Sequence, residues 1–430
     1  MTRGGYLRGV AMAASSNFTI QVMGAASGFA LAYILQPEGR GAYAAVIAWS
    51  GTLSTFGALG ITAAITYFVA IGNRRDDVVR TAQHLLLGLS MGALLLGLAV
   101  TPFLAGDNDA LRLAYLIAFL SLPVTFLSGT WVFALQGADL RRWASVRLVH
   151  PMAYLALLTV LYGMDTLTVP WVISAVTASA AAQAIFAYRS WKRISSGRGS
   201  YDRRLARPLI RYGLRILASQ APFLLNSRVD QLVLSVAVPL SDLGRYAVAV
   251  SLTLLVFPLT SAFGSVALPY IAKQNQTDAR AARTTWRLAV AGSLVIGSLG
   301  AVVVAALTPV VIPAVLGDSY KGIETLVYIL APGAVLLGLN QVVGDVLRGY
   351  DQALLVARAE GVAAVLTVVL MVALIPTLGV VGAAISSTCS YGLSTVMLIR
   401  YASRHSLERT SAAVVEPPPA SVAPPELPGG

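Results

Sequence analysis

Long apolar runs, separated by short segments rich in Lys and Arg, are the feature of this sequence that most restricts its fold. A helix that crosses a membrane needs about 20 mostly apolar residues, and the 430-residue chain contains twelve such runs. Because lipid offers the backbone no hydrogen-bond partner, each run is predicted to be a helix. Their approximate limits are 12–35, 43–70, 84–105, 113–136, 148–164, 169–190, 212–238, 245–271, 288–312, 322–345, 359–377 and 381–400.

The composition excludes the main soluble classes of protein. Charged residues make up 12% of the chain and hydrophobic residues 57%, whereas roughly a quarter of a soluble protein is charged. A water-soluble enzyme, a disordered protein and a coiled coil are therefore excluded. The predicted fold class is all-α, a polytopic membrane protein with about twelve transmembrane helices.

Lys and Arg lie almost entirely on one side of the predicted spans. If the N-terminus is placed in the cytoplasm, 26 of the 31 basic residues are cytoplasmic, and the outer side holds only Arg40, Arg112, Arg245 and Lys321. Cytoplasmic loops are enriched in Lys and Arg. The sequence therefore predicts a multi-pass protein of the cell membrane with both termini in the cytoplasm. The net charge of +12 is explained by topology, and no nucleic-acid partner is predicted.

Two pairs of similar segments indicate an internal duplication. Segment 37–44 resembles segment 240–247, with Gly41 matching Gly244 and Tyr43 matching Tyr246 at an offset of 203 residues. A second pair, 135–139 and 347–351, has an offset of 212 residues. Six helices per half give both halves the same orientation. We therefore expect two six-helix lobes related by a pseudo-two-fold axis along the membrane normal, with the substrate between them.

The duplication and the local composition define four segments. Residues 1–190 form the N-terminal lobe, 191–211 a basic cytoplasmic linker, and 212–405 the C-terminal lobe. Residues 406–430 form a Pro-rich cytoplasmic tail that is expected to be disordered. The linker is suited to anionic lipid head groups, although its charge is better explained as a topology signal.

The run 212–238 is unusually polar for a membrane helix. A central Arg or Asp costs roughly 2.5–3.5 kcal/mol on insertion, so Arg228 and Asp230 are expected to face a partner or a water-filled cavity. They are two residues apart and do not pair along a helix, which leaves Arg228 free to meet an anionic substrate. The alternative is a structural ion pair with another helix. The cavity interpretation also includes Gln220, Asn226 and Gln231.

The run 12–35, which corresponds to 212–238 in the repeat, carries Asn17 and Gln21 one turn apart. At the offset of 203 residues, Asn17 matches Gln220. Polar stripes on both helices suggest a shared cavity wall, and ordinary interhelical hydrogen bonding is an equally good explanation. The candidate residues of the substrate cavity are thus Arg228, Asn226, Gln220, Gln231, Asn17 and Gln21.

The sequence shows no pattern typical of catalysis. It has no phosphate-binding loop, no paired metal-ligand spacing and no nucleophile motif. We therefore predict that the protein is not an enzyme and that it has no metal site and no cofactor. Any energy for transport would come from an ion gradient, the membrane potential or the gradient of the substrate.

Four stretches of the chain carry a resemblance to a known family. They are Leu35 to Tyr43 (LQPEGRGAY), Arg228 to Gln231 (RVDQ) followed by Gly244-Arg245-Tyr246, Ala267-Leu268-Pro269, and Ile375-Pro376 with Gly379 and Gly382-Ala383-Ala384. With these stretches the sequence resembles the polysaccharide flippases of the Wzx type, in the multidrug/oligosaccharidyl-lipid/polysaccharide exporter superfamily.

The resemblance implies a function and roles for particular residues. It implies transport of an oligosaccharide linked to undecaprenyl pyrophosphate from the inner to the outer leaflet, by alternating access of two lobes. Arg228 would meet the pyrophosphate, and Asp230 with Asn226 would help to bind a coupling cation, Na⁺ or H⁺. Implied partners are the lipid-linked oligosaccharide, membrane lipids, a polysaccharide polymerase and glycosyltransferases.

Two other functions remain as alternatives. A cation-coupled multidrug exporter of the same superfamily would use an acidic cavity, and the run 12–35 has no acidic residue. A membrane polysaccharide polymerase or ligase would present a large outer loop, and the predicted outer loops are short.

Overall fold

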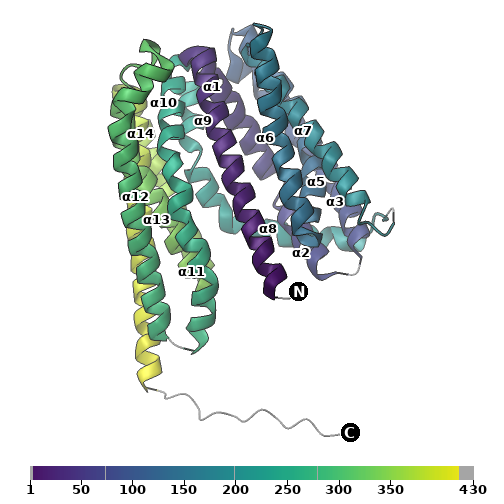
Figure 1. Cartoon of the computed structure of the whole chain (residues 1–430), viewed down its shortest axis with the longest axis vertical. Helices are drawn as coiled ribbons and strands as arrows, with labels where there is room; N and C mark the ends of the chain where they lie inside the picture. The colour runs from purple at the N-terminus through teal and green to yellow at the C-terminus, as the bar shows by residue number, and fades with distance from the viewer. Residues whose placement is uncertain (1–2, 73, 198, 278, 416–430) are drawn as a thin grey trace.

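The computed structural model describes residues 3–72, 74–197, 199–277 and 279–415, and all regular structure within these ranges is helical (Figure 1). Such a fold is expected when apolar runs must satisfy their own backbone hydrogen bonds. The N-terminal half contains α1 (Arg3–Gly57), α2 (Ile61–Ile71), α3 (Arg75–Ala105), α4 (Asp109–Leu120), α5 (Leu122–Ala138), α6 (Leu140–Gly163) and α7 (Val169–Lys192).

The C-terminal half forms a second bundle beside the first (Figure 1). It contains α8 (Arg203–Asn226), α9 (Val229–Ala237), α10 (Leu240–Thr253), α11 (Phe257–Thr277), α12 (Ala279–Leu316), α13 (Ile323–Gly349) and α14 (Ala353–Val415). Two 3₁₀ turns, Leu254–Val256 and Asp318–Tyr320, lie between these helices. Helix α8 packs on α2 and α3 of the first bundle and on α14 of the second, so it connects the two halves.

The predicted all-helical membrane fold is confirmed. Nine helices of the described ranges are long and apolar enough to cross a membrane. Two of them, Ser15–Gly57 with 43 residues and Ala353–Arg404 with 52, are more than twice as long as the roughly 20 residues that one crossing needs. They are interrupted by non-helical backbone at Gln36 (φ 56°) and Gly379 (φ 55°), between runs that the sequence separates. The count of twelve crossings stays a prediction.

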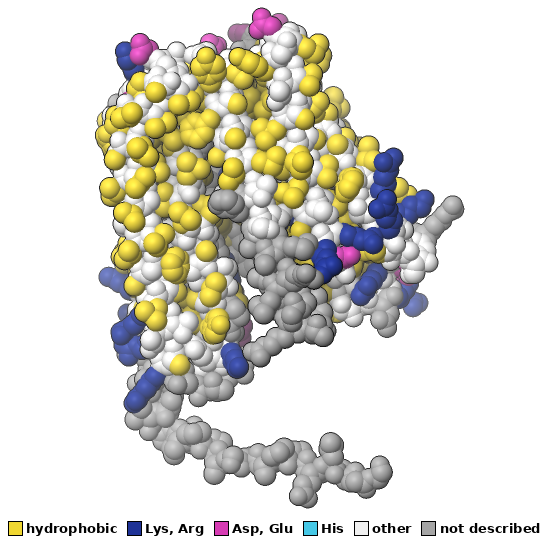
Figure 2. All heavy atoms as spheres, viewed as in Figure 1, with side chains coloured by type: hydrophobic (Ala, Val, Ile, Leu, Met, Phe, Trp, Pro, Cys, Tyr) yellow, Lys and Arg dark blue, Asp and Glu magenta, His cyan; other side chains and the backbone are white. Residues whose placement is uncertain are grey.

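The surface has the charge distribution that the sequence suggests. Figure 2 shows apolar side chains over the flanks of the molecule and most Lys and Arg on its lower part, while Asp and Glu lie at the top and also among the basic side chains. Exposed apolar side chains such as Leu95, Val295 and Val372 are more than 60% accessible. Large exposed apolar surfaces of this kind mark contact with lipid or protein.

Helices extend into the segments that the sequence assigns to the linker and the tail. Helix α8 begins at Arg203, within the predicted linker 191–211, because the Asp202 carboxylate caps its first turn by accepting the N–H of Arg204 at 2.8 Å. That N–H, together with the guanidinium of Arg74, lowers the pKa of the Asp202 carboxyl. Helix α14 continues to Val415, since 406–415 contains no Pro or Gly. Residues 416–430 of the predicted tail lie outside the described residues.

The two halves meet backbone to backbone where α1 crosses α10. A Cβ on Gly41 would overlap the carbonyl oxygen of Leu240, and a Cβ on Gly244 would overlap that of Pro37. Gly41 and Gly244 are 203 residues apart, and so are Pro37 and Leu240, which is the offset of the repeat. The contact between the halves is therefore reciprocal. The pseudo-two-fold axis of the lobes stays a prediction, and this pair of contacts is the local arrangement that such an axis produces.

Candidate functional site

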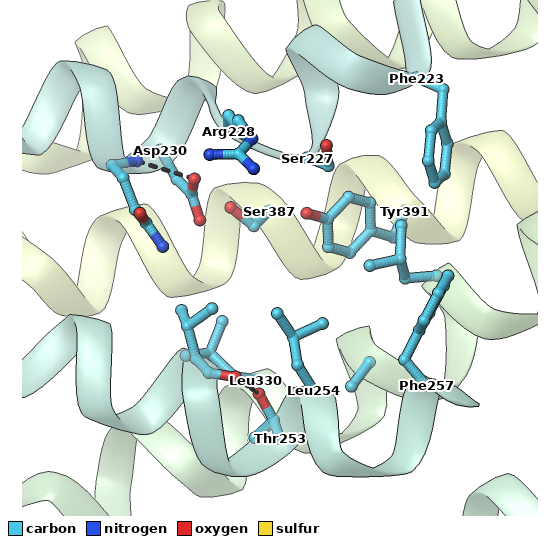
Figure 3. Close-up of a pocket in the computed structure, with 14 residues that line it drawn as sticks. Phe223, Ser227, Arg228, Asp230, Thr253, Leu254, Phe257, Leu330, Ser387 and Tyr391 are labelled. Atoms are coloured by element: carbon cyan, nitrogen blue, oxygen red, sulfur yellow. Dashed lines mark hydrogen bonds between the residues drawn. The ribbon is translucent and has the colours of Figure 1, made fainter. Parts of the chain in front are cut away.

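A cavity of about 340 Å³ lies in the C-terminal half, which we call the C-terminal cavity (Figure 3). Its wall includes three of the predicted site residues. The lining residues come from α8 to α11, α13, α14 and the turns between them: Phe223, Ser227, Arg228, Asp230, Gln231, Val250, Thr253, Leu254, Phe257, Leu330, Ala334, Leu337, Ser387 and Tyr391.

A break in the helix places Arg228 in this wall. Helix α8 ends at Asn226 and α9 begins at Val229, so the break is at Ser227–Arg228 and not at Pro222, which lies within α8. The Arg228 side chain is exposed and points into the cavity in Figure 3. Its guanidinium makes no ion pair with any residue of the described ranges. The cation is therefore available to a ligand.

Asp230 is held by neutral donors beside this cation. Its side chain is 4% exposed. The Tyr246 hydroxyl donates to Oδ2 at 2.7 Å, and the backbone N–H of Gln231 donates to Oδ1 at 2.7 Å. Tyr246 is the tyrosine that matches Tyr43 in the repeat. A buried carboxyl with neutral partners is suited to binding a proton or a cation.

Asn226 points away from the cavity into a second buried cluster. Its Nδ2 donates to Glu360 Oε2 at 3.2 Å, and its Oδ1 accepts from the Thr367 hydroxyl at 2.8 Å. Glu360 is 1% exposed and also accepts from the Ser394 hydroxyl at 2.7 Å. The sequence analysis missed Glu360. The available signal was a lone carboxylate in the apolar run 359–377.

The remaining predicted residues are spread over the molecule. Gln231 lines the C-terminal cavity, whereas Gln220 is exposed on α8 outside it. Asn17 and Gln21 are exposed on α1, and Asn17 accepts a hydrogen bond from Arg147 of α6 at 2.7 Å. The structure thus gathers Arg228, Asp230 and Gln231, and it does not bring Asn17 or Gln21 to the same wall.

A second cavity, of about 520 Å³, lies in the N-terminal half, and we call it the N-terminal cavity. Its polar lining is neutral amide, hydroxyl and imidazole, with no Asp, Glu, Lys or Arg. Gln183 accepts from Ser128 at 3.4 Å and donates to the Val146 carbonyl at 3.3 Å, and His150 is 2.8 Å from the Ser179 hydroxyl. The lining residues are Ser54, Thr55, Ala58, Thr62, Leu86, Thr125, Phe126, Ser128, Gly129, Val132, Phe133, His150, Val176, Ala180 and Gln183.

Helix α1 runs from one cavity to the other. A Cβ on Gly51 would lie 3.3 Å from Arg228 Nη1, so the guanidinium lies against α1. Ser54 and Thr55 of the N-terminal cavity follow one turn later. One turn of helix is about 5.4 Å, so Arg228 lies near the edge of the neutral cavity.

Several solved structures of transporters have the same fold as this chain. An inward-facing multidrug resistance MATE transporter of the MOP superfamily matches with a TM-score of 0.75 and 15% identity, over 93% of this chain and 99% of that chain. The lipid II flippase MurJ, in an inward closed conformation, matches with a TM-score of 0.72 and 13% identity, over 94% of this chain and 90% of that one. An outward-facing MATE transporter gives a TM-score of 0.54 at 14% identity, over 93% of each chain. The fold is that of MOP-superfamily transporters.

The sequence then identifies the family within this class. The family model for polysaccharide biosynthesis proteins matches residues 6–275, and the chain belongs to this family. The resemblance predicted from the four stretches is therefore confirmed. A curated relative, the probable low-salt glycan biosynthesis flippase Agl15 of Haloferax volcanii, is 24% identical over 201 residues. That match spans 46% of this chain and 42% of the relative.

Proposed function

We propose that this protein moves a lipid-linked oligosaccharide from the inner to the outer leaflet of the cell membrane by alternating access of its two halves. The observation that carries the proposal is the position of Arg228. It is an exposed cation at a helix break, it lies at the contact between the halves, and it forms no salt bridge within 4.0 Å in the described ranges. A phosphate group is the natural ligand of such a guanidinium.

The neutral cavity beside Arg228 supports a glycan substrate. Sugars present many hydroxyl groups and little charge, and hydroxyl and amide side chains bind them without a charge that would have to be desolvated. Phe126 and Phe133 add apolar faces to this wall. In this proposal the phosphate lies at Arg228 and the glycan extends toward Gln183.

Two of the buried carboxyls, Asp230 and Glu360, are our proposed sites for a coupling cation, Na⁺ or H⁺. Asp230 and Asn226 belong to separate clusters, the first with Tyr246 and the second with Glu360. We therefore extend the predicted pair Asp230 and Asn226 to include Glu360. No other cofactor is proposed.

The multidrug-exporter alternative receives less support. A cationic drug would require a carboxylate that faces the cavity, whereas Asp230 is 4% exposed and the accessible charge is that of Arg228. An anionic substrate fits this arrangement better. A location in the cell membrane with both termini in the cytoplasm, and cooperation with a polymerase and glycosyltransferases, belong to the same proposal.

Depletion of the protein from its cells tests the function. Mass spectrometry of lipid extracts is expected to show an undecaprenyl-pyrophosphate-linked oligosaccharide, and a membrane-impermeant glycan-modifying reagent should find it in the inner leaflet. Normal surface polysaccharide without such accumulation, in cells that lack other members of the family, would contradict the proposal. Accumulation of exported drugs in the same cells would favour the multidrug alternative.

A further inference from the structure

Arg40 is a buried cation whose charge nothing else in the described ranges neutralises. The sequence analysis assigned it to an outer loop, but α1 continues through it and the residue is only 7% exposed. Its Nη2 donates to the Ser251 hydroxyl at 3.4 Å, and its guanidinium carbon lies 5.4 Å from the centre of the Tyr43 ring. Its Nε is buried and makes no hydrogen bond within the described part of the chain.

Other arginines of the protein have the acidic partner that Arg40 lacks. Arg74, Arg142, Arg245 and Arg348 each pair with an Asp at 2.7–3.2 Å, although all four are more exposed than Arg40. No Asp or Glu of the described ranges lies within 4.0 Å of the Arg40 guanidinium. A buried charge is costly unless it is paired and hydrogen-bonded, so an anion from outside the chain is the expected partner.

A pocket beside Arg40 has room for such an anion. It measures about 160 Å³, lies between α1 and α10, and is lined by Arg40, Tyr43 and Ser251 among others. At about 30 Å³ per water molecule, it would hold about five waters or one tetrahedral oxyanion. Gly24 and Gly28 form part of its wall, and a Cβ on either would meet no atom within 4 Å.

The pocket is separate from the Arg228 cavity. Val248 and Ser251 of α10 face this pocket, whereas Val250 and Thr253 face the C-terminal cavity. Residues 3–35 of α1 rise about 50 Å at 1.5 Å per residue. The Arg40 pocket is therefore placed far from the N-terminus.

We propose that Arg40, with Tyr43 and Ser251, forms a second anion site that takes a phosphate group. The planar guanidinium of Arg40 donates to the phosphate oxygens, and Tyr43 and Ser251 supply hydroxyl groups in the same wall. The phosphate comes either from the head group of an anionic phospholipid or from solution. The site does not depend on the transport function proposed above.

Thermal unfolding of the purified protein in detergent tests the site, with inorganic phosphate as the probe. The Arg228→Gln variant removes the cation of the C-terminal cavity and serves as the background. At saturating phosphate its Tm is expected to rise by about 3–5 °C. The double variant R40Q/R228Q should show no rise, whereas the control R245Q/R228Q, which removes a half-exposed and ion-paired arginine, should behave like the background.

A second variant keeps the test valid if Arg40→Gln does not fold. Gly28→Leu fills the pocket and retains Arg40, so it should also abolish the rise in Tm. Nanodiscs of phosphatidylglycerol, compared with phosphatidylcholine, identify the source. An Arg40-dependent stabilisation by phosphatidylglycerol indicates a lipid head group, and one seen only with inorganic phosphate indicates a soluble ion. The proposal is overturned if the background shows no rise, if the rise survives in R40Q/R228Q, or if acetate produces the same rise.

Discussion

The two halves of the molecule enclose cavities of different chemistry. The N-terminal cavity is the larger, about 520 Å³, and its polar lining is neutral. The C-terminal cavity is about 340 Å³ and presents Arg228 beside the buried Asp230, with Glu360 in a cluster behind it. The difference teaches that these two cavities suit different ligands: the C-terminal cavity offers a cation beside a buried carboxyl, and the N-terminal cavity offers neutral hydrogen-bonding groups.

The origin of this difference is visible at equivalent positions. At the offset of 203 residues, the helix break at Ser227–Arg228 corresponds to Gly24–Ala25, where α1 is uninterrupted. Asp230, which binds Tyr246, corresponds to Ser27, which donates to the Gly24 carbonyl of its own helix. Without the break and the carboxylate, the equivalent wall of the first half lacks counterparts of Arg228 and Asp230, and the pocket there carries Arg40 instead.

Removing the buried carboxylate of Glu360 should have the largest effect. Glu360→Ala leaves Asn226 Nδ2 and the Ser394 hydroxyl without their acceptors. Unsatisfied buried polar groups cost about 1–3 kcal/mol each, so the free energy of unfolding should fall by about 2–6 kcal/mol. Chemical denaturation measures this loss.

Glu360→Gln is the matched control, because its amide keeps one acceptor and the shape of the side chain. It should retain the fold and lose the dependence of transport on an ion gradient. A Glu360→Ala variant as stable as the wild type would show that the cluster is not structural.

Substitution of Arg228 should have the second-largest effect, which is on the rate of transport. Hydrogen bonds to charged groups contribute about 1.5–3 kcal/mol, so Arg228→Gln should slow transport about 10- to 100-fold. Translocation of a lipid-linked oligosaccharide in proteoliposomes measures the rate. The control Arg245→Gln removes an equal charge from a surface ion pair and should stay within about twofold of the wild type, since such pairs contribute little. Equal losses in both variants would refute a specific role for Arg228.

Substitutions in the N-terminal cavity should reduce transport less than substitution of Arg228. Gln183→Leu removes one neutral amide from the N-terminal cavity, and a neutral hydrogen bond contributes about 0.5–1.5 kcal/mol. Transport should therefore fall about 2- to 10-fold, through weaker substrate binding. Gln220→Leu, at an exposed glutamine outside both cavities, is the control. If the two variants transport equally well, the N-terminal cavity does not bind the glycan.

The smallest effect is expected at the connection between the halves, where Asp202 caps α8 and binds Arg74 at 2.9 Å. Because the folded-state pKa of Asp202 is lowered, its contribution to stability is present above the unfolded pKa of about 3.9 and is lost as the pH falls through the folded pKa. Asp202→Asn should lower the Tm slightly at pH 7, and the difference should shrink as the pH falls below about 3.9 and through the folded pKa. A difference in Tm that does not change with pH would mean that the charge plays no part.

The sequence predicts the helical membrane fold and the position of Arg228 in a cavity wall. Both predictions follow from the free-energy cost of placing polar groups in lipid. Asp230 and Gln231 lie close to Arg228 along the chain and were found with it. Glu360 was missed because its partners Asn226 and Ser394 come from 134 and 34 residues away. Such pairings depend on how helices pack, and helical periodicity does not contain that information.

For Arg40 and Asn17, the sequence analysis predicted surroundings that the structure does not show. A short polar stretch predicted an exposed loop at Arg40, but helix α1 resumes immediately after its kink at Gln36 and carries the arginine into the contact with α10. Asn17 matched Gln220 in the repeat, yet it binds Arg147 and lies apart from the C-terminal cavity. Equivalence within a repeat predicts the position of a residue along its helix but not which neighbour it contacts.

The reciprocal contact at Gly41 and Gly244 restricts which substitutions either half can accept. Each glycine lies against a carbonyl oxygen of the other half, at Leu240 and at Pro37. A larger residue on one side therefore meets backbone and no side chain that a second substitution could shorten. The two halves differ in their cavities, but at this crossing neither can accept a side chain unless an entire helix moves.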